Sequence, residues 1–403
     1  MGIVHVLLSA AVTAGPVPLL APPPGACANP DPARPVVAAR PWAQQVLDPA
    51  AVWPFSTGAG VTVAVVDSGV DSDHPQLRGG AVLRGEDFHL VGDLPGSFDC
   101  DSHGTAVASI IAARSVAGVG FAGLAPGATI LPVRVSDRGY TDAGGVAMID
   151  PVVLARGIWY AADHGAKVLN LSLAGTADDK LIRDAVAHAR ERDVLVVAAA
   201  GNGQQGTEPQ RTYPAAYDGV LGVGAVDESG VRLTGSQIGP QVDLVAPGGG
   251  VLAATRAGGH QYWQGTSFAA PFVAATAALV RSAWPQLTAD QVAARILATA
   301  TPTPGGPGSA AYGAGLVNPY RAVTDGLVSA APAALPALRP DPRPPAPPPM
   351  PALKILGAAV AIAVLILLGV AVLRRGRRER WQVRRAAPVA EVPPSTEVPD
   401  RLF

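Results

Sequence analysis

The sequence has few cysteines, the residues that form disulfide bonds and bind metals through sulfur. Its 403 residues include only two cysteines, Cys27 and Cys100. No CxxC pair occurs, which argues against a structural zinc site. The two cysteines allow one disulfide bond if the chain is exported. We therefore predict neither a metal site nor a cofactor.

Charge is also scarce. Charged residues make up 15% of the chain and hydrophobic residues 49%, a balance too apolar for a disordered protein. The formal net charge of −1 conceals a split. Residues 374–403 hold eight arginines against four acidic residues, so the remaining 373 residues sum to −5. This mildly acidic body argues against nucleic acid as the main partner.

One long apolar run stands near the C-terminus. Ile355–Leu373 contains 19 residues without a charge, about 28 Å of helix and close to the thickness of a bilayer core. Lys354 precedes the run, and seven arginines follow it within residues 374–385. We predict a transmembrane helix over residues 355–373. The arginines place the basic tail, residues 374–403, in the cytoplasm and everything upstream outside.

Two segments are consistent with export. Residues 3–15 resemble the apolar part of a signal peptide, although no Lys or Arg precedes them. We assign residues 1–28 to a signal region, with cleavage after Ala14 or after Ala28. Residues 329–354 form a linker with ten prolines between Pro332 and Pro351, which favours extended polyproline II. Such a spacer holds a domain up to about 60 Å from the membrane.

The middle of the chain, residues 51–328, alternates apolar runs with helical patterns. This order is typical of an α/β fold whose parallel sheet is covered on both faces. Ligands and catalytic groups collect at the C-terminal ends of such strands. The predicted strands are 61–67, 128–135, 167–173, 194–202, 220–226 and 242–247, and the predicted helices are 104–114, 150–164, 178–191 and 267–284.

Three polar residues lie at the strand ends and helix starts where catalytic groups are expected in such a fold. Asp67 ends an apolar strand, and His103 and Ser267 each open a helix rich in small residues. Each has an ordinary alternative, because Asp-Ser-Gly forms turns and His or Ser can cap a helix. Their order along the chain, Asp then His then Ser, is one of the known orders of a serine-hydrolase triad.

The surrounding motifs carry a resemblance to a known family. VAVVDSGVDSDHPQL, HGTAVASIIAA, VLVVAAAGN and GTSFAAPFVAATAALV occur in the order found in subtilases, the subtilisin-like serine proteases. The match covers roughly Trp53–Val323. The resemblance implies a three-layer subtilisin-like fold with a central, mostly parallel sheet. It also implies acyl transfer, with Ser267 as nucleophile, His103 as general base and Asp67 orienting the imidazole.

The resemblance extends to residues around the triad. Asn202 matches the side chain that, with the backbone N–H of Ser267, stabilises the oxyanion; otherwise its Asn-Gly sequence indicates a turn. Ser172, Leu173 and Ala174 match the edge that pairs with an extended substrate. Ala174 replaces the usual glycine, which narrows the pocket. We expect Pro271 to be tolerated because it lies in the first helical turn, where N–H groups lack partners.

The layout of the whole chain resembles that of the mycosins, the membrane-anchored proteases of type VII secretion systems in actinobacteria. The resemblance implies a Cys27–Cys100 disulfide, which requires signal cleavage before residue 27 and so favours the Ala14 site. Removal of Cys27 with the signal and lipidation of Cys27 are the alternatives. The resemblance also implies an N-terminal arm, residues 29–50, that packs on the domain surface rather than filling the cleft.

These resemblances lead to one functional expectation with two rivals. We expect a single-pass cell-membrane protein whose extracytoplasmic endopeptidase domain processes secreted proteins or peptides beside a type VII secretion membrane complex. The first rival is a mainly structural component of that complex. The second is a general degradative surface protease. Subtilases often bind calcium, but no run of oxygen ligands in this sequence is specific enough to assign a site.

Overall fold

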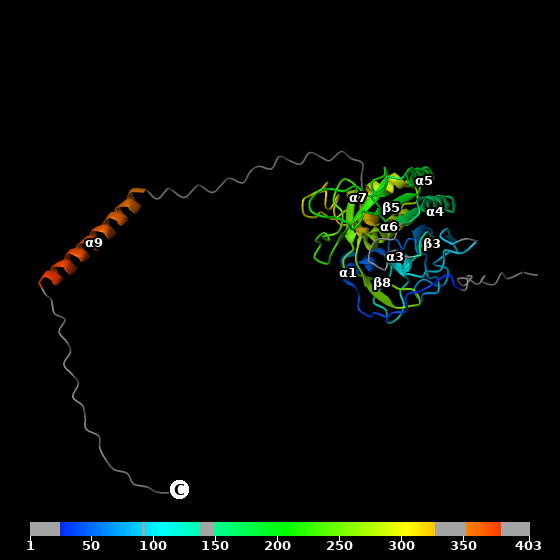
Figure 1. Cartoon of the computed structure of the whole chain (residues 1–403), viewed down its shortest axis with the longest axis horizontal. Coiled ribbons are helices and arrows are strands. Elements are labelled where there is room, and N and C mark those ends of the chain that lie inside the picture. The colour runs from blue at the N-terminus through cyan, green and yellow to red at the C-terminus, as the bar shows by residue number, and fades with distance from the viewer. Residues whose placement is uncertain (1–24, 91–92, 138–148, 327–351, 380–403) are drawn as a thin grey trace, which may run out of the picture. The chain divides into compact units, whose positions relative to one another are not determined.

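The structure is a computed structural model that describes residues 25–90, 93–137, 149–326 and 352–379 (Figure 1). The chain divides into two compact units, Met1–Val328 and Ser329–Phe403. Of the predicted signal region 1–28, only residues 25–28 are described, so the proposed cleavage site after Ala14 lies outside the described residues. The same holds for the proline-rich part of the linker and for the tail beyond residue 379.

The first unit is built on a seven-stranded sheet in which every paired strand is parallel. The spatial order is β2-β3-β1-β4-β5-β6-β7. The strands are β1 (Thr62–Asp67), β2 (Glu86–Asp87), β3 (Thr129–Arg134), β4 (Val168–Leu171), β5 (Leu195–Ala199), β6 (Val220–Val226) and β7 (Leu244–Pro247). All six strands that the apolar runs predict are present; the two-residue edge strand β2 carries too little sequence pattern to predict.

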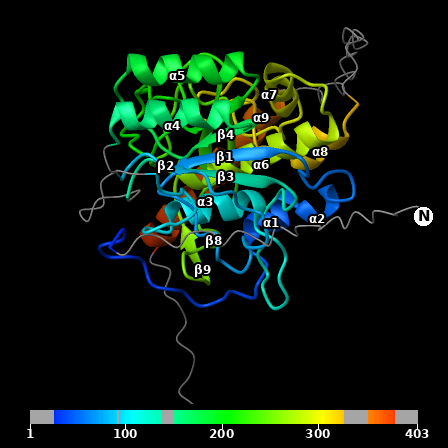
Figure 2. The same cartoon turned by 90° about the vertical axis from the view of Figure 1, so that its right-hand side faces the viewer.

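Helices cover both faces of this sheet. They are α1 (Trp42–Leu47), α2 (Pro49–Val52), α3 (His103–Ala112), α4 (Pro151–Asp163), α5 (Lys180–Glu191), α6 (Thr266–Ala283), α7 (Ala289–Ala298) and α8 (Pro319–Thr324). Figure 2 shows α4 and α5 on one side of the strands and α3 on the other. The four helices that the sequence predicts correspond to α3, α4, α5 and α6.

Alternation along β1 explains the three layers. Val63 and Val65 join the core that contains α3 and α6, whereas Ala64 and Val66 join the core that contains α4 and α5. All four residues are fully buried. A strand covered on both faces must be apolar at every position, which is why its sequence reads as a continuous hydrophobic run. The fold is therefore the expected three-layer α/β arrangement.

A two-stranded antiparallel hairpin, β8 (Val251–Ala254) and β9 (His260–Trp263), lies outside the main sheet. The N-terminal arm runs along it. The backbone N–H of Arg34 donates to the carbonyl of Gly258 at 3.0 Å, and that of His260 donates to Pro35 at 3.0 Å. Farther on, the Trp42 indole donates to the carbonyl of Gly249 at 3.0 Å. None of these arm contacts involves Asp67, His103, Asn202 or Ser267.

A disulfide bond joins Cys27 to Cys100. It links the start of the described arm to the loop that leads into α3. The backbone N–H of Asp31 also donates to the carbonyl of Cys100 at 2.9 Å. Arg256 completes the connection, because its guanidinium donates to the carbonyls of both Asp31 and Asp99. The arm and the hairpin are thus fastened to the segment immediately before His103.

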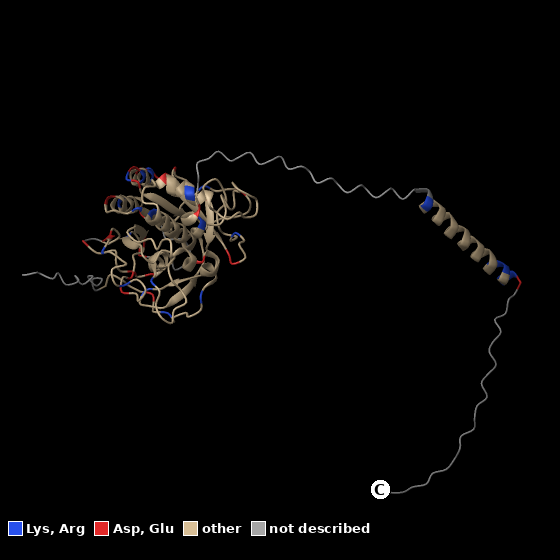
Figure 3. Ribbon diagram, turned by 180° about the vertical axis from the view of Figure 1, so that it is seen from behind, with Lys and Arg blue, Asp and Glu red and all other residues tan. Residues whose placement is uncertain are grey.

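The second unit contains one described helix, α9 (Ala352–Arg378). Within the described residues, the stretch Lys354–Arg378 is the one helix long and apolar enough to cross a membrane, with a mean hydropathy of 3.0 in its most apolar part. Figure 3 shows basic residues at its two ends and none between them. The helix includes the predicted span 355–373 and extends by about one turn at each end.

Candidate active site

Residues from five segments meet at the C-terminal edge of the sheet. Asp67 is the last residue of β1, Ser172 directly follows β4, and Asn202 lies three residues beyond β5. These three strands are neighbours in the sheet. His103 is the first residue of α3, and Ser267 is the second residue of α6. The side chains predicted from motifs far apart in sequence are therefore presented from one rim.

Asp67 and His103 form a buried, directly bonded pair. His103 Nδ1 lies 2.7 Å from Asp67 Oδ1, and the two residues are only 3% and 5% exposed. The backbone N–H of Ser68 donates to the same carboxylate oxygen at 2.7 Å. Burial alone lowers the pKa of His103, but the carboxylates of Asp67, Asp101 and Asp99 outweigh it and raise this pKa above its ordinary value.

A second buried carboxylate, Asp99, supports the pair. It accepts hydrogen bonds from the Ser68 hydroxyl at 3.0 Å and from the Thr105 hydroxyl and backbone N–H at 2.6 and 2.9 Å. Burial raises the pKa of Asp99, partly opposed by the hydrogen bonds that it accepts from Thr105 and from the backbone N–H of Asp101. The network ties the turn after β1 to the first turn of α3. Asp99 was not among the predicted site residues, although its place four residues before His103 is a signal that could have indicated it.

Ser267 is held to Ser172, in the segment that follows β4, by two reciprocal hydrogen bonds. Its hydroxyl donates to the carbonyl of Ser172 at 3.0 Å, and the Ser172 hydroxyl donates to the carbonyl of Ser267 at 2.6 Å. The ring of Phe268 lies 5.1 Å from the His103 ring, centroid to centroid. The start of α6 therefore packs directly against the imidazole.

Pro271 is accommodated in α6, but not for the reason that we expected, because it does not lie in the first helical turn. Pro271 is the sixth residue of α6, beyond the first turn, so its missing N–H removes the helical bond to the carbonyl of Ser267. That carbonyl is not left unsatisfied, because it accepts the Ser172 hydroxyl. The proline is tolerated because the hydroxyl of Ser172, in the segment after β4, replaces the bond.

Asn202 is oriented by the N-terminus of α6. Its Oδ1 accepts the backbone N–H of Thr266 at 2.8 Å and the Thr266 hydroxyl at 3.1 Å. Among the described residues, none accepts a hydrogen bond from Asn202 Nδ2, which leaves this donor available. A methyl group built on Gly265 would lie 3.1 Å from Asn202 Nδ2, so only glycine leaves room for the amide. Gly265 also has a φ of +136°, which disfavours other residues.

The Ser172–Ala174 segment offers a partly open edge. Ser172 is buried, whereas Leu173 and Ala174 are half-buried and Gly175 is exposed. Gly175 and Tyr213 exchange backbone hydrogen bonds of 2.9 and 2.8 Å, so the segment is held in extended form by a second stretch of chain. An extended peptide can pair with such an edge through main-chain hydrogen bonds.

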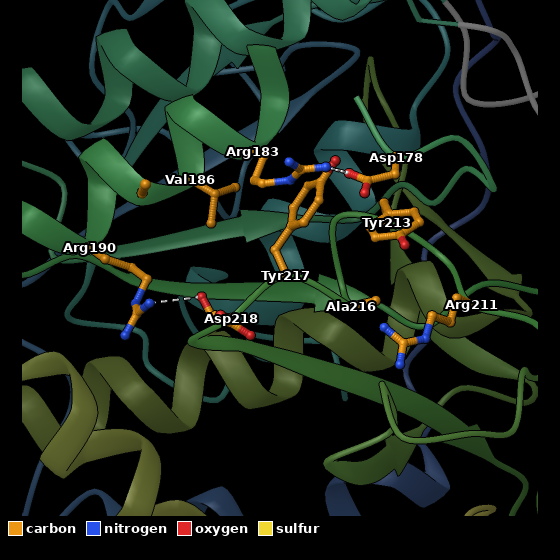
Figure 4. Close-up of a pocket in the computed structure, with 10 residues that line it drawn as sticks. Asp178, Arg183, Val186, Arg190, Arg211, Tyr213, Ala216, Tyr217 and Asp218 are labelled. Atoms are coloured by element: carbon orange, nitrogen blue, oxygen red, sulfur yellow. Dashed lines mark hydrogen bonds and ion pairs between the residues drawn. The ribbon is translucent and has the colours of Figure 1, made fainter. Parts of the chain in front are cut away.

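A separate polar cavity of about 340 Å³ lies beside α5 (Figure 4). It is lined by Asp178, Arg183, Val186, Ala187, Arg190, Arg211, Tyr213, Ala216, Tyr217 and Asp218. Arg183 pairs with Asp178, and Arg190 donates to the carbonyl of Asp218 at 3.1 Å. Burial raises the pKa of Tyr217 to about 12. The cavity contains none of the predicted site residues.

Within the described residues, no group of three or more His, Cys, Asp or Glu is arranged to hold a metal ion.

Comparisons with the sequences of known proteins all match the same family of proteases. The model of the subtilase family matches residues 58–315. The thermostable alkaline protease of Halalkalibacterium halodurans is 39% identical over 66% of this chain and 68% of its own length. Thermitase of Thermoactinomyces vulgaris is 36% identical over 72% of this chain and 99% of its own length.

Solved structures extend the comparison. The MycP3 protease from the type VII (ESX-3) secretion system superposes with a TM-score of 0.64 at 34% identity, covering 77% of this chain and 98% of that one. MycP1 from Mycobacterium smegmatis gives 0.63 at 31% identity, covering 78% and 95%. Together with the family match over more than half of the chain, these likenesses show that the protein is a subtilisin-like serine endopeptidase and belongs to the subtilase family.

Proposed function

We propose that the protein is a membrane-anchored endopeptidase that cleaves secreted proteins or peptides through Asp67, His103 and Ser267. The observation that carries this proposal is the buried 2.7 Å contact between His103 and Asp67 beside the start of α6. A buried carboxylate on Nδ1 fixes the imidazole so that its other nitrogen can accept a proton. The raised pKa of His103 reflects the same stabilisation of the imidazolium.

In the proposed reaction the Ser267 hydroxyl attacks the scissile carbonyl and His103 takes its proton. The negative charge that develops on the carbonyl oxygen is stabilised by the backbone N–H of Ser267 and by Asn202 Nδ2. When the C–N bond breaks, His103 returns the proton to the leaving amine. Water then repeats the sequence on the acyl-enzyme, releases the acid product and restores the serine. The N-terminal end of α6 adds its dipole at the oxyanion.

Membrane anchoring is proposed from α9. Its apolar length is sufficient to span a bilayer, and Arg374, Arg375, Arg377 and Arg378 follow its apolar part. The excess of arginine on this side favours a cytoplasmic C-terminus, with the peptidase unit on the opposite side. A disulfide between Cys27 and Cys100 is consistent with an oxidising compartment.

Association with a type VII secretion system is proposed from the likeness to proteases whose structures are described as parts of such systems. The alternative is a mainly structural role in the same membrane complex, because a folded peptidase unit can serve as a subunit without cleaving. Two observations support catalysis: His103 is bonded to the buried Asp67, and Asn202 is held by the backbone N–H of Thr266, the residue before Ser267.

The catalytic proposal is tested with the full chain in detergent. Ser267→Ala should abolish hydrolysis of a peptide mixture, whereas Ser282→Ala, in the same helix and distant from the rim, should leave it unchanged. Ser282 donates to the carbonyl of Ala59 and contacts none of the site residues in the described hydrogen bonds. Equal activity of Ser267→Ala and the parent protein would end the proposal.

The two cellular roles separate in a complementation experiment. If cleavage is the role, Ser267→Ala should fail to restore processing of a secreted substrate in a strain that lacks the protein. If the role is structural, Ser267→Ala should restore secretion fully while the deletion does not. Unimpaired secretion and processing in the deletion strain would contradict both roles.

A further inference from the structure

A fully buried cation ends the strand next to Asp67. Arg134 is the last residue of β3, and it is the register partner of Asp67 on β1 and of Asp87 on β2. Side chains in register on neighbouring parallel strands point to the same face of a sheet, so the three residues form a row. Burying a guanidinium is costly unless its donors find partners, so the positions of these partners indicate what the residue holds in place.

The donors of Arg134 are distributed over three segments. Nη1 donates to Asp87 Oδ2 at 2.8 Å, and both side chains are fully buried. Nη2 pairs with the partly exposed Asp137, three residues farther along the chain. Nε donates to the backbone carbonyl of Ser68 at 3.1 Å. The ion pair with Asp87 therefore anchors the guanidinium, and the Nε bond extends its hold to the turn that follows β1.

The bond to Ser68 leads directly to Asp67. The backbone N–H of Ser68 donates to Asp67 Oδ1 at 2.7 Å, and the same oxygen lies 2.7 Å from His103 Nδ1. A methyl group built on Gly69 would lie 3.1 Å from Arg134 Cδ, so the stem of the arginine packs against the same turn. The orientation of the Asp67 carboxylate thus depends on Ser68, whose carbonyl is held by Arg134.

Arg134 also contacts the segment that brings His103 to the site. Its Cζ lies 4.7 Å from the centroid of the Phe98 ring, a cation–π contact. Its Nη2 lies 3.9 Å from Cys100 Sγ. Phe98 and Cys100 precede His103 by five and three positions. One guanidinium therefore touches both segments that meet in the bond between Asp67 and His103: the turn after β1 and the loop before α3.

We infer that Arg134 is a positioning residue for catalysis, which acts through Ser68 to hold the Asp67 carboxylate against His103. This inference rests on the proposed function, because it concerns how the same pair is presented. Within the described residues, none of the hydrogen bonds, ion pairs or ring contacts of Arg134 reaches the substrate edge or Ser267. Loss of Arg134 should therefore lower kcat and leave KM nearly unchanged, since it misplaces the proton acceptor without altering the surface that binds the peptide.

The test compares the parent chain in detergent with Arg134→Met, which keeps most of the length of the stem and removes every donor. On one peptide kcat should fall at least about tenfold, because a displacement of about 1 Å in a catalytic group costs up to about 10²-fold. The kcat is expressed per active site, titrated with a fluorophosphonate, so that an unfolded fraction does not count.

Arg281→Met is the matched control. Arg281 is also a buried arginine paired with an aspartate, Asp193, at 3.0 Å, but it lies in the last turn of α6, at the opposite end from Ser267. This variant should lower the Tm and leave kcat unchanged. A loss of kcat as large as that of Arg134→Met would show a general effect of removing a buried arginine and would overturn the inference.

A double variant separates positioning from stability. Arg134→Met leaves the buried Asp87 carboxylate without its main partner, and adding Asp87→Asn removes that unpaired charge. The double variant should therefore have a higher Tm than Arg134→Met. Its kcat should stay low, because the carbonyl of Ser68 still lacks the donor that fixed it.

Three results would overturn the inference and leave the proposed function intact. They are a parental kcat in Arg134→Met, a raised KM with kcat unchanged, and a double variant that recovers both Tm and kcat. Failure of the parent protein to cleave any peptide would instead remove the proposed function, and this inference with it.

Discussion

Ser172 and Ser267 exchange two hydrogen bonds, each hydroxyl donating to the other residue's carbonyl at 2.6 and 3.0 Å. The bond from Ser172 replaces the one that Pro271 removes from α6. These bonds fix the position of the proposed substrate edge, which follows β4, relative to the helix that carries the proposed nucleophile. A substrate paired with this edge is consequently held at a fixed position relative to Ser267.

Ser172→Ala should reduce both stability and activity. It leaves the buried carbonyl of Ser267 without a donor, which costs about 1–3 kcal/mol in the free energy of unfolding. Adding Pro271→Ala to this variant restores a helical N–H to the same carbonyl and should recover part of the loss. Denaturant unfolding of the parent, the two single variants and the double variant measures the coupling. Strictly additive effects would show that the two residues do not share this carbonyl.

Asn202→Ala should lower kcat while changing KM little, because the amide is needed only when charge develops on the oxygen. The expected loss is about 10²–10³ in kcat, a magnitude carried over from the equivalent donor in subtilisin. Steady-state kinetics on one peptide measures it. A raised KM with kcat unchanged would mean that Asn202 binds the ground state and does not stabilise the oxyanion.

Activity should rise with pH through the pKa of His103. Only the neutral imidazole can accept the proton of Ser267, and nearby carboxylates raise the pKa of His103 above 6.5. The acid limb of kcat/KM should therefore have its inflection above pH 6.5. Asp101→Asn removes one of these charges and should move the inflection to lower pH. A shift to higher pH would contradict the electrostatic account.

The disulfide should stabilise the peptidase unit. Cys27 and Cys100 are separated by 73 residues, and closing a loop of that size restricts the unfolded chain by about 4 kcal/mol in the loop-entropy model. Cys27→Ser with Cys100→Ser should lower the Tm, and a reducing agent should lower the Tm of the parent protein but not of the variant. Equal Tm values for the two oxidised proteins would contradict this prediction.

The arm should loosen in acid through His260. Its Nδ1 accepts the backbone N–H of Val37 at 3.2 Å and its Nε2 donates to Gln76 at 2.7 Å, so the docked imidazole is neutral. Burial, with the adjacent His74, lowers the pKa of His260 to about 4. A lowered histidine pKa means that the undocked state binds more protons, so arm docking weakens as pH falls from 6.5 toward 4.

The charged and titratable groups around this histidine are few. His74 faces His260 with ring centroids 6.2 Å apart, and Asp71 acts electrostatically on His74. Gln76 and Phe121 also contact the His260 ring. The measurement is hydrogen exchange of the Val37 backbone N–H. The His260→Gln variant is the control, because a glutamine side chain gains no charge between pH 6.5 and 4. Protection at Val37 that is independent of pH between 6.5 and 4 would be inconsistent with this role for His260.

The sequence was sufficient for six strands of the parallel sheet and for α3, α4, α5 and α6, because continuous apolar strands and strongly patterned helices carry local signals; α7 and β2 were not predicted. It was not sufficient where structure depends on contacts between distant segments. The hairpin that carries His260 is stabilised by the arm, and Asp99 acquires its role only when Ser68 and Thr105 close around it. Pro271 was wrongly expected to need no helical partner, because it is the sixth residue of a helix that begins at Thr266 and lies beyond the first turn.

The central claim is that Ser267 is a nucleophile activated by His103. A fluorophosphonate reacts with such a serine, and peptide mass mapping locates the adduct. The account predicts one adduct per chain, on Ser267, that forms at least about a hundredfold more slowly in His103→Ala. An adduct on another serine, or labelling of Ser267 that proceeds equally well without His103, would contradict it.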